Sequence, residues 1–320
     1  MSPNATSKSY AIIGVAGYIA PRHLKAIKET GGRLDVAYDV NDSVGIMDSH
    51  FPDAAFFTEF EQFDTFVSSQ SQAGQQLDYV SICSPNYLHR AHIGYGLRAV
   101  ADVICEKPLV LNPSDIDHLA EIERETGRTV NSILQLRLHE SILALKAKVD
   151  AGPADKIYDV DLGYFTSRGA WYHASWKGLE HKSGGIATNI GVHFYDMLGF
   201  VFGPLKSSTV HYRGADAAAG YLEFAQARVR WLLSINRNHL PPQTPAGQST
   251  YRSITVDGEE VEFSGGFTEL HTKSYAAILV GQGYGLDTVR PSIELVTGIR
   301  HAPIEPGKGE AHPLLSAIQG

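Results

Sequence analysis

Two short segments, far apart in the chain, carry residue types that suit hydride transfer. The first is Glu106-Lys107-Pro108, which directly follows the apolar run 102–105. The second covers residues 184–196, GGIATNIGVHFYD, and places His193 on a helix behind two glycines. A lysine can hold and polarise an alcohol oxygen, and a histidine can accept the alcohol's proton. The pair predicts an enzyme that oxidises an alcohol, although Lys107 considered alone is more typical of a solvated residue at a strand end.

A nucleotide-binding loop is expected at residues 14–20, between an apolar run and a helical pattern. Glycines at such a turn let backbone N–H groups approach a pyrophosphate at the positive end of a helix. Gly17 and Ala20 match the second half of the dinucleotide fingerprint, but the first glycine stands one residue too early. An ordinary strand–turn–helix would show the same pattern. The residues that we expect to contact the cofactor here are Gly14, Ala16, Gly17, Tyr18 and Ile19.

Asp39 ends the next expected strand, where an acidic residue accepts hydrogen bonds from the adenosine ribose hydroxyls. The same carboxylate repels a 2′-phosphate, and residues 40–47 contain no Arg or Lys to compensate. The sequence therefore predicts NAD rather than NADP as the cofactor. The alternative is that Asp39 only caps the following helix.

Other polar residues follow the apolar run 78–83, at the sheet edge where open α/β sheets bind ligands. Ser84 and Asn86 could contact the cofactor there, although Pro85-Asn86 also suits an ordinary turn. His89 fits the start of a helix better than a catalytic role. The expected cofactor site is completed by Ser84, Asn86, His89, Glu106 and Lys107.

The first part of the chain alternates short apolar runs with helical patterns. The expected strands are 10–14, 34–38, 78–83, 102–105 and 130–134, and the expected helices lie near 23–27, 89–99 and 113–126. Strands and helices that alternate with short connections indicate βαβ units. We therefore predict an α/β fold whose N-terminal domain, residues 1–134, is a Rossmann-type, doubly wound parallel sheet that binds a dinucleotide.

The alternation of apolar runs with helical patterns ends near residue 135. A helix at 139–150 precedes runs of alternating hydrophobicity at 157–165, 207–212, 227–235, 251–256 and 260–263, the last two joined by a turn at Asp257-Gly258. Further helices are expected at 189–202, 267–280 and 287–300, with Asp287 as the N-cap of the last. Residues 135–320 are therefore expected to form an α+β domain with a largely antiparallel sheet.

Composition narrows the class of protein. A chain of 320 residues with 43% hydrophobic and 19% charged residues fits two globular domains. The net charge of -8 argues against a nucleic-acid or anionic-membrane partner. Cys83 and Cys105 lie in apolar runs and favour buried thiols over a disulfide. Residues 1–9 lack the apolar stretch of a signal peptide, no run is long enough to span a membrane, and no metal-ligand cluster is apparent, so we expect a cytoplasmic protein without a metal.

With these motifs the chain resembles the glucose-fructose oxidoreductase, inositol dehydrogenase and MocA superfamily (Gfo/Idh/MocA) over essentially its full length. The markers are the dinucleotide fold, the segment Glu106-Lys107-Pro108, and a Gly-x-His-x-x-Asp pattern in which His193 is the histidine and Asp196 the aspartate. The resemblance implies a Rossmann domain and an open-faced, mainly antiparallel sheet domain that binds the sugar and mediates oligomers, with a homotetramer expected. It also implies that Lys107 and His193 form the catalytic pair.

Two departures from the common pattern point to one branch of this superfamily. Asn189 replaces an aspartate that many members carry, and the glycine loop is irregular. Because residues i and i+4 of an α-helix share a face, Asn189 could orient His193 or bind a sugar hydroxyl, but it supplies no charge. These departures resemble the UDP-N-acetylglucosaminuronate 3-dehydrogenases, as do the segments 166–172, 175–178, 219–223, 227–231, 251–255 and 281–285.

That branch implies NAD-dependent oxidation of the 3-hydroxyl of a UDP-linked N-acetyl-hexosaminuronate, in the synthesis of surface-polysaccharide sugars such as those of the lipopolysaccharide O-antigen. The resemblance also implies that members of this branch keep the cofactor tightly bound, and that some reoxidise it with 2-oxoglutarate. Two other readings remain. A dehydrogenase of a free polyol or sugar would not bind UDP-sugars, whereas a non-catalytic dinucleotide-binding regulator would not need both Lys107 and His193.

A substrate with a diphosphate and a carboxylate requires cations. The first candidates are Arg168, Lys177 and Lys182, and the second choices are Arg137 and Arg252. Each of them could equally be a surface or ion-paired residue. Trp171, Tyr172 and Trp176 could form a platform for the sugar or the uracil, or could simply be packed in the interior. The expected substrate site thus consists of Lys107, Arg168, Trp176, Lys177, Lys182, Asn189 and His193.

Overall fold

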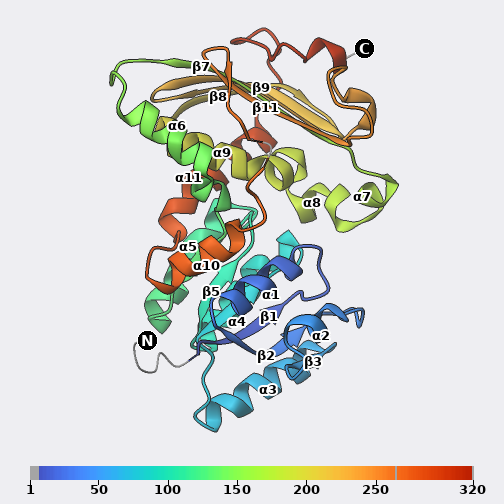
Figure 1. The fold of residues 1–320 in the computed structure, drawn as a ribbon, viewed down its shortest axis with the longest axis vertical. Helices are drawn as coiled ribbons and strands as arrows, with labels where there is room; N and C mark the ends of the chain where they lie inside the picture. The colour runs from blue at the N-terminus through green and yellow to red at the C-terminus, as the bar shows by residue number, and fades with distance from the viewer. Residues whose placement is uncertain (1–6, 264, 319–320) are drawn as a thin grey trace. The chain divides into compact units, whose positions relative to one another are not determined.

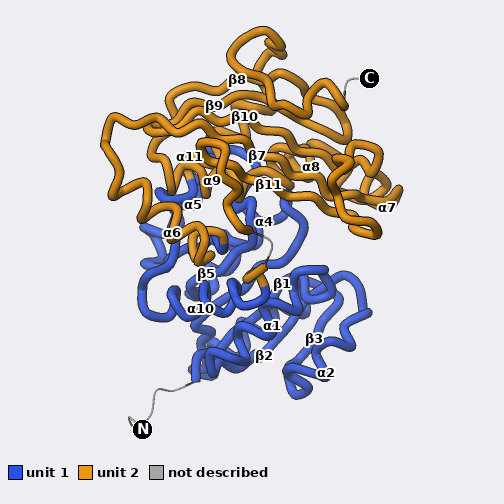
Figure 2. Tube along the Cα trace, turned by 45° about the horizontal axis from the view of Figure 1, so that its top comes forward, with its two compact units in different colours: residues 1–135, 268–289 blue, residues 136–267, 290–320 orange. Residues whose placement is uncertain are grey.

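The structure, a computed structural model, describes residues 7–263 and 265–318 (Figure 1). Residues 1–6 of the segment 1–9, which lacks the apolar stretch of a signal peptide, lie outside that range. The chain divides into two compact units, residues 1–135 with 268–289 and residues 136–267 with 290–320 (Figure 2). The first transition coincides with the expected domain boundary near residue 134. Residues 268–289, which the sequence places in the second domain, belong to the first unit.

Unit 1 contains a six-stranded sheet in the order β3-β2-β1-β4-β5-β6. Every neighbouring pair is parallel. This strand order is that of a doubly wound dinucleotide-binding sheet, so the predicted fold class is confirmed. The strands are β1 (Ser9–Ile13), β2 (Arg33–Tyr38), β3 (Ala55–Phe57), β4 (Tyr79–Ile82), β5 (Asp102–Cys105) and β6 (Val130–Ser132).

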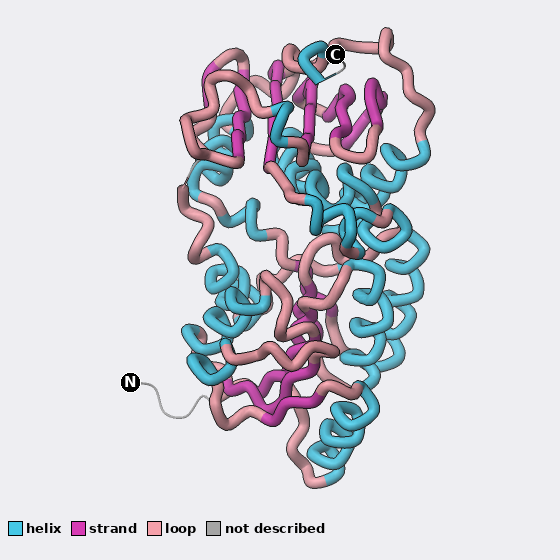
Figure 3. The backbone as a smooth tube through the Cα atoms, turned by 90° about the vertical axis from the view of Figure 1, so that its right-hand side faces the viewer, coloured by secondary structure: helices cyan, strands magenta, loops and turns pink. Residues whose placement is uncertain are grey.

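Helices cover both faces of this sheet (Figure 3). They are α1 (Ala20–Glu29), α2 (Ile46–His50), α3 (Phe60–Gln72), α4 (His89–Arg98), α5 (Pro113–Thr126) and α10 (Leu270–Leu279). The segment α2-β3-α3 was not expected from the sequence. Its signals are weak, because β3 has only three residues and α3 buries only Phe63 and Val67.

Helix α10 explains why residues 268–289 return to unit 1. Tyr275 and Ile278, which are buried, pack into the same apolar core as Tyr10 of β1 and Leu24 of α1. Burying a large apolar side chain stabilises a fold by about 1.5–3 kcal/mol. The apolar face of α10 therefore stays with the Rossmann-type sheet. Both cysteines are buried free thiols, as expected.

Unit 2 contains a second six-stranded sheet, in the order β12-β11-β7-β10-β9-β8. The central pair β7 and β10 is parallel and the other pairs are antiparallel, which confirms a largely antiparallel sheet. The expected turn is present, with positive φ at Asp257 and Gly258. The strands are β7 (Tyr158–Thr166), β8 (Leu205–Arg213), β9 (Ala217–Phe224), β10 (Ala227–Ser234), β11 (Thr250–Val256) and β12 (Glu259–Glu260). Strand β9 was missed, and β12 is shorter than the expected run 260–263.

The two faces of this sheet have different covers. On one face Tyr195 of α9 (Val192–Phe202) packs edge-on against Trp231, with ring centroids 5.3 Å apart. On the other face Leu315 and Ile318 of the C-terminal segment pack against β-strand residues such as Leu232. The C-terminal segment thus covers part of the face that the resemblance implied to be open.

Unit 2 has two further long helices, α6 and α11, and two short ones, α7 and α8. They are α6 (Glu140–Asp150), α7 (Ala170–Ala174), α8 (Glu180–Ser183) and α11 (Leu286–His301), whose first residues belong to unit 1. Asp287 lies in the first turn of α11 and is not the residue before it. Most of the expected helix 189–202 is α9, and its first residues belong to a π-helix (Ala187–Gly191) that leads into α9. Among the described residues, no helix is long and apolar enough to cross a membrane.

Candidate active site

The glycine loop joins β1 to α1 at the carboxyl edge of the parallel sheet. Gly14 has φ of 91°, and a Cβ added there would lie 2.6 Å from the backbone nitrogen of Ser84. Only glycine therefore lets the ends of β1 and β4 approach so closely. The Gly17 N–H donates to the Gly14 carbonyl at 3.1 Å, and α1 begins three residues later with Pro21 in its first turn. The loop has the tight turn that a pyrophosphate-binding site needs.

Asp39 holds this loop from the end of β2. One carboxylate oxygen accepts the Ala16 N–H at 3.0 Å, and the other accepts the Asn41 N–H at 2.9 Å. The alternative that Asp39 caps the next helix is wrong, because α2 begins at Ile46 behind Gly45. Since a carboxylate offers about four acceptor sites, Asp39 can also accept from ribose hydroxyls. Within the same loop, Tyr18 is 90% exposed.

The loops after β4 and β5 are tied together by His89. Its Nε2 lies 2.8 Å from the Ser84 carbonyl oxygen, and its Nδ1 lies 2.8 Å from the Pro108 carbonyl oxygen. The ring is buried, and His89 is the first residue of α4, as the sequence suggested. The Ser84 hydroxyl is paired with His92 Nδ1 at 2.8 Å, and Asn86 is buried at the start of a short 3-10 helix. His89 thus supports the loops that carry the expected cofactor residues.

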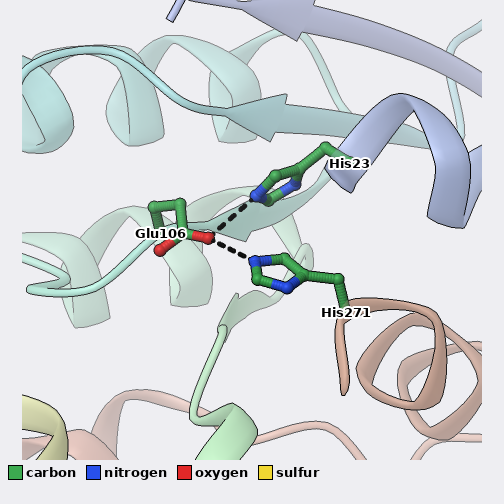
Figure 4. A group of neighbouring side chains, drawn as sticks. All are labelled: His23, Glu106 and His271. Atoms are coloured by element: carbon green, nitrogen blue, oxygen red, sulfur yellow. Dashed lines mark hydrogen bonds and ion pairs between the residues drawn. The ribbon is translucent and has the colours of Figure 1, made fainter. Parts of the chain in front are cut away.

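Lys107 directly follows β5 and Glu106, so it lies at the same carboxyl edge as the glycine loop. It is half-buried, and its peptide bond to Pro108 is cis. Its backbone N–H donates to Glu106 Oε2 at 3.1 Å. The other Glu106 oxygen accepts from two buried histidines (Figure 4). The sequence gives no local signal for this cluster, because His23, Glu106 and His271 are far apart in the chain.

His193 belongs to unit 2, where it is half-buried in the first turn of α9. One turn later, Asp196 forms a bidentate ion pair with Arg137. Arg137 Nε donates to Asp196 Oδ2 at 2.8 Å, and Nη2 donates to Oδ1 at 2.7 Å. Arg137 was expected as a reserve cation for the substrate. That expectation is corrected, because its guanidinium is committed to a buried carboxylate on the His193 helix.

Asn189 lies in the π-helix that precedes α9. Its side-chain amide donates to the hydroxyl of Tyr172, which is 2% exposed, at 2.8 Å. Tyr172 is therefore a packing residue that braces the turn before His193. Asn189 and His193 would share a face only in a regular α-helix, whereas π-helical hydrogen bonds run from i to i+5 and change which residues share a face.

Lys177 lies between two tryptophans. Its Nζ is 4.3 Å from the ring centre of Trp176 and 5.5 Å from that of Trp171. Burial and the neighbouring charge of Arg168 lower the pKa of the Lys177 ammonium below its usual value. Lys177 also lines a pocket of about 80 Å³ that Glu180, Gly184, Arg213 and Arg300 help to form. Arg213 and Arg300 are cations for which the sequence gives no local signal.

The other expected cations have different surroundings. Arg168 is exposed just beyond β7, and Lys182 is half-buried on α8. Arg252 stacks on Phe267 at 4.4 Å and donates to the Phe263 carbonyl at 3.1 Å. Arg252 thus packs against aromatic residues of unit 2, and its expected role as an additional substrate cation stays a prediction.

Comparison with known proteins identifies both halves of the chain. Residues 8–133 match the oxidoreductase family with an NAD-binding Rossmann fold (GFO_IDH_MocA), and residues 146–244 match the C-terminal alpha/beta domain of that family. The crystal structure of the WlbA (WbpB) dehydrogenase from Thermus thermophilus, in complex with NAD and UDP-GlcNAcA, is 49% identical. It covers 96% of this chain and 100% of that chain, with a TM-score of 0.92.

A second structure of the same enzyme, in complex with NAD and alpha-ketoglutarate, has 49% identity, the same coverage and a TM-score of 0.93. The D-glucoside 3-dehydrogenase of Escherichia coli (strain K12) is 25% identical over 178 residues, 48% of this chain and 51% of that protein. The chain spans about half or less of the length of the first curated relatives that it matches, at 42%, 51% and 36%.

Proposed function

Because this chain belongs to the Gfo/Idh/MocA oxidoreductase family, we propose that it catalyses the NAD-dependent oxidation of the 3-hydroxyl of UDP-N-acetylglucosaminuronate. The observation that carries the proposal is the 49% identity, over the full length of the Thermus enzyme, to a dehydrogenase crystallised with NAD and UDP-GlcNAcA. The product would be the corresponding 3-keto sugar nucleotide, an intermediate for surface-polysaccharide sugars.

The residues of the chain support a simple mechanism. His193 accepts the proton of the 3-hydroxyl, and the Lys107 ammonium donates a hydrogen bond to the same oxygen and stabilises its developing negative charge. NAD, when bound, accepts the hydride from C3. Lys107 belongs to unit 1 and His193 to unit 2.

The cofactor preference follows from Asp39. Its carboxylate accepts from the glycine loop and has acceptor sites left for the adenosine ribose. A 2′-phosphate at that position would meet a negative charge. We therefore propose NAD, held by Gly14, Ala16, Gly17 and the polar residues after β4.

The substrate's negative charges call for cations in unit 2. We propose that Arg168, Lys177 and Lys182 bind the diphosphate and the carboxylate, with Trp176 packing beside Lys177. Because the Thermus enzyme was also crystallised with alpha-ketoglutarate, we propose 2-oxoglutarate as the compound that reoxidises NADH. A homotetramer in the cytoplasm, where nucleotide sugars are made, completes the proposal.

The test compares UDP-N-acetylglucosaminuronate with UDP-N-acetylglucosamine, which lacks the carboxylate, and with free sugars and inositol. Reduced nicotinamide is followed by absorbance. We expect turnover of the uronate and little turnover of the others. Equal turnover of both UDP-sugars would reject the uronate, and turnover of free polyols alone would reject the nucleotide.

Lys177→Gln refines this test. The loss of a charge-assisted contact weakens binding by about 1.5–3 kcal/mol, so KM for the uronate should rise roughly ten- to a hundredfold. The matched control is Lys206→Gln, an exposed lysine on β8. An unchanged KM in Lys177→Gln would remove this residue from the proposed anion site.

A further inference from the structure

Three side chains from distant parts of unit 1, His23, Glu106 and His271, meet in its interior (Figure 4). His23 of α1 is 0% exposed, Glu106 is 5% exposed and His271 of α10 is 1% exposed. Glu106 Oε1 lies 3.0 Å from His23 Nε2 and 2.7 Å from His271 Nε2. Its Oε2 lies 3.1 Å from the backbone nitrogen of Lys107. A single carboxylate therefore accepts three hydrogen bonds, and the third comes from the backbone of the proposed catalytic lysine.

The hydrogen bonds continue behind His23. Its Nδ1 is 2.8 Å from the Tyr275 hydroxyl, which is 2.7 Å from the Ser81 hydroxyl on β4. If Ser81 donates to Tyr275 and Tyr275 donates to Nδ1, a neutral His23 presents its Nε2–H to Glu106. In this order each of the two hydroxyls and each ring nitrogen of His23 has a defined role as donor or acceptor. The His23 ring therefore cannot turn without breaking two hydrogen bonds.

The cluster keeps Glu106 ionised. Burial alone would raise the pKa of this carboxyl, but the hydrogen bonds that it accepts from His23 and His271 outweigh burial and hold the pKa well below its usual value. Burial lowers the pKa of His23 in spite of Glu106, which favours the neutral ring. A buried carboxylate with fixed donors is rigid, because each lost donor would leave charge without compensation.

Two histidines and a glutamate can also hold a metal ion. The separations of 2.7 Å and 3.0 Å between nitrogen and oxygen are ordinary hydrogen-bond lengths. Ligands about 2.0–2.1 Å from a tetrahedral zinc ion would lie farther apart, roughly 3.3 Å from one another. The geometry thus favours direct hydrogen bonds.

We propose that Glu106, clamped by His23 and His271, is a positioning residue for Lys107, and that it acts through the Lys107 backbone N–H. This inference rests on the proposed function, in which Lys107 binds the reacting oxygen. The clamp joins α1, β5 and α10, so the return of residues 268–289 to unit 1 becomes part of the active site's support. An error of about 1 Å in such a group can lower a rate a hundredfold.

The first test is Glu106→Gln. Glutamine keeps one acceptor oxygen for the two histidines but turns its NH2 group toward the Lys107 N–H, which then loses its acceptor. We expect kcat to fall roughly ten- to a hundredfold, with the Kd for NAD within about threefold of the wild type. In a Lys107→Met background the same substitution should change kcat less than about threefold, because coupled residues are non-additive. A full additional loss in that background would overturn the proposal.

Two further variants separate positioning from general stability. His271→Gln keeps an N–H donor near the position of Nε2, so it should retain a higher kcat than His271→Ala. An equal loss of kcat in the two variants would contradict the proposed role of the His271–Glu106 hydrogen bond. The matched control is Asp78→Asn, which removes a hydrogen-bonded carboxylate that binds Lys8 and Ser9 at the opposite edge of the sheet. It should lower the melting temperature without lowering kcat, and an equal fall in kcat would mean that stability alone explains Glu106.

Two measurements do not depend on the identity of the sugar. Hydrogen exchange of the Lys107 amide should be slow in the wild type and at least about tenfold faster in Glu106→Gln. This result can hold even if the UDP-sugar assignment fails, so the two failures are distinguishable, and unchanged exchange would overturn the clamp. Metal analysis of the purified wild-type protein should find no stoichiometric zinc. If the wild type contained one zinc ion per chain and His271→Ala contained none, a metal site would replace the proposal.

Discussion

The ion pair between Arg137 and Asp196 should be the most sensitive electrostatic contact of unit 2. The carboxylate side chain is 3% exposed and the guanidinium is 14% exposed, and the two share bonds of 2.7 Å and 2.8 Å. Removing one partner of such a pair leaves a buried charge without compensation, which costs about 3–5 kcal/mol. Asp196→Asn should therefore destabilise unit 2 by that amount and loosen the helix that carries His193.

All three tryptophans, Trp171, Trp176 and Trp231, belong to unit 2, so their fluorescence reports the unfolding of that unit. Trp231 is 0% exposed and should shift strongly when the sheet opens. With a dependence on urea of about 1–3 kcal/mol per molar, a loss of 3–5 kcal/mol should lower the midpoint by roughly 1–2 M or more. Activity at low urea should fall as well, since α9 loses its anchor.

The control is the exposed pair Lys148–Glu259, whose side chains are 64% and 78% exposed. Lys148→Ala should change the free energy of unfolding by less than about 1 kcal/mol. The double variant Arg137→Met with Asp196→Leu should recover much of the stability, because no charge is then left buried. If Asp196→Asn behaves like Lys148→Ala, the pair is effectively solvated and the reasoning fails.

Three further substitutions test the proposed chemistry. Lys107→Met should lower kcat by several orders of magnitude while NAD still binds, because the lost interaction is with charge that develops on oxygen; near-normal turnover would exclude Lys107 from the reaction. His193→Asn should remove most activity, and the wild-type rate should fall at acidic pH as the base becomes protonated, so an active variant together with a flat acidic limb would make His193 structural. Asp39→Ala should weaken NAD binding and raise the ratio of NADP to NAD turnover, measured with both cofactors, because a ribose acceptor and a negative charge disappear together; an unchanged ratio would leave Asp39 only as the support of the glycine loop.

The sequence predicted the features that depend on short-range patterns. The run 102–105 is apolar and is β5, so Lys107 had to follow a buried strand at the carboxyl edge of the sheet. Helix α5 begins and ends at the predicted residues, because Pro113 suits a first turn and Gly127 adopts the left-handed conformation that ends a helix. Periodicity and turn chemistry act over a few residues, and such signals are readable in a single chain.

The misses share a different cause. The π-helix at 187–191 has no pattern of its own, and it arises where Asn189 bonds to Tyr172 and Gly191 packs closely against Leu233. The sequence could not decide whether Arg137 binds substrate or is ion-paired, because its partner, Asp196, is distant in sequence and near only after α9 has folded.

By itself the sequence determined most strands and helices of the two domains, the glycine turn, and the choice of Lys107, Asp39 and His193 as candidate functional residues. Only the tertiary structure decided that residues 268–289 return to unit 1 and that His271 meets Glu106 there. The physical reason is that local dihedral preferences and hydrophobic periods are encoded within a few neighbouring residues, whereas a buried carboxylate acquires its donors from whichever segments the packing of the apolar core brings together.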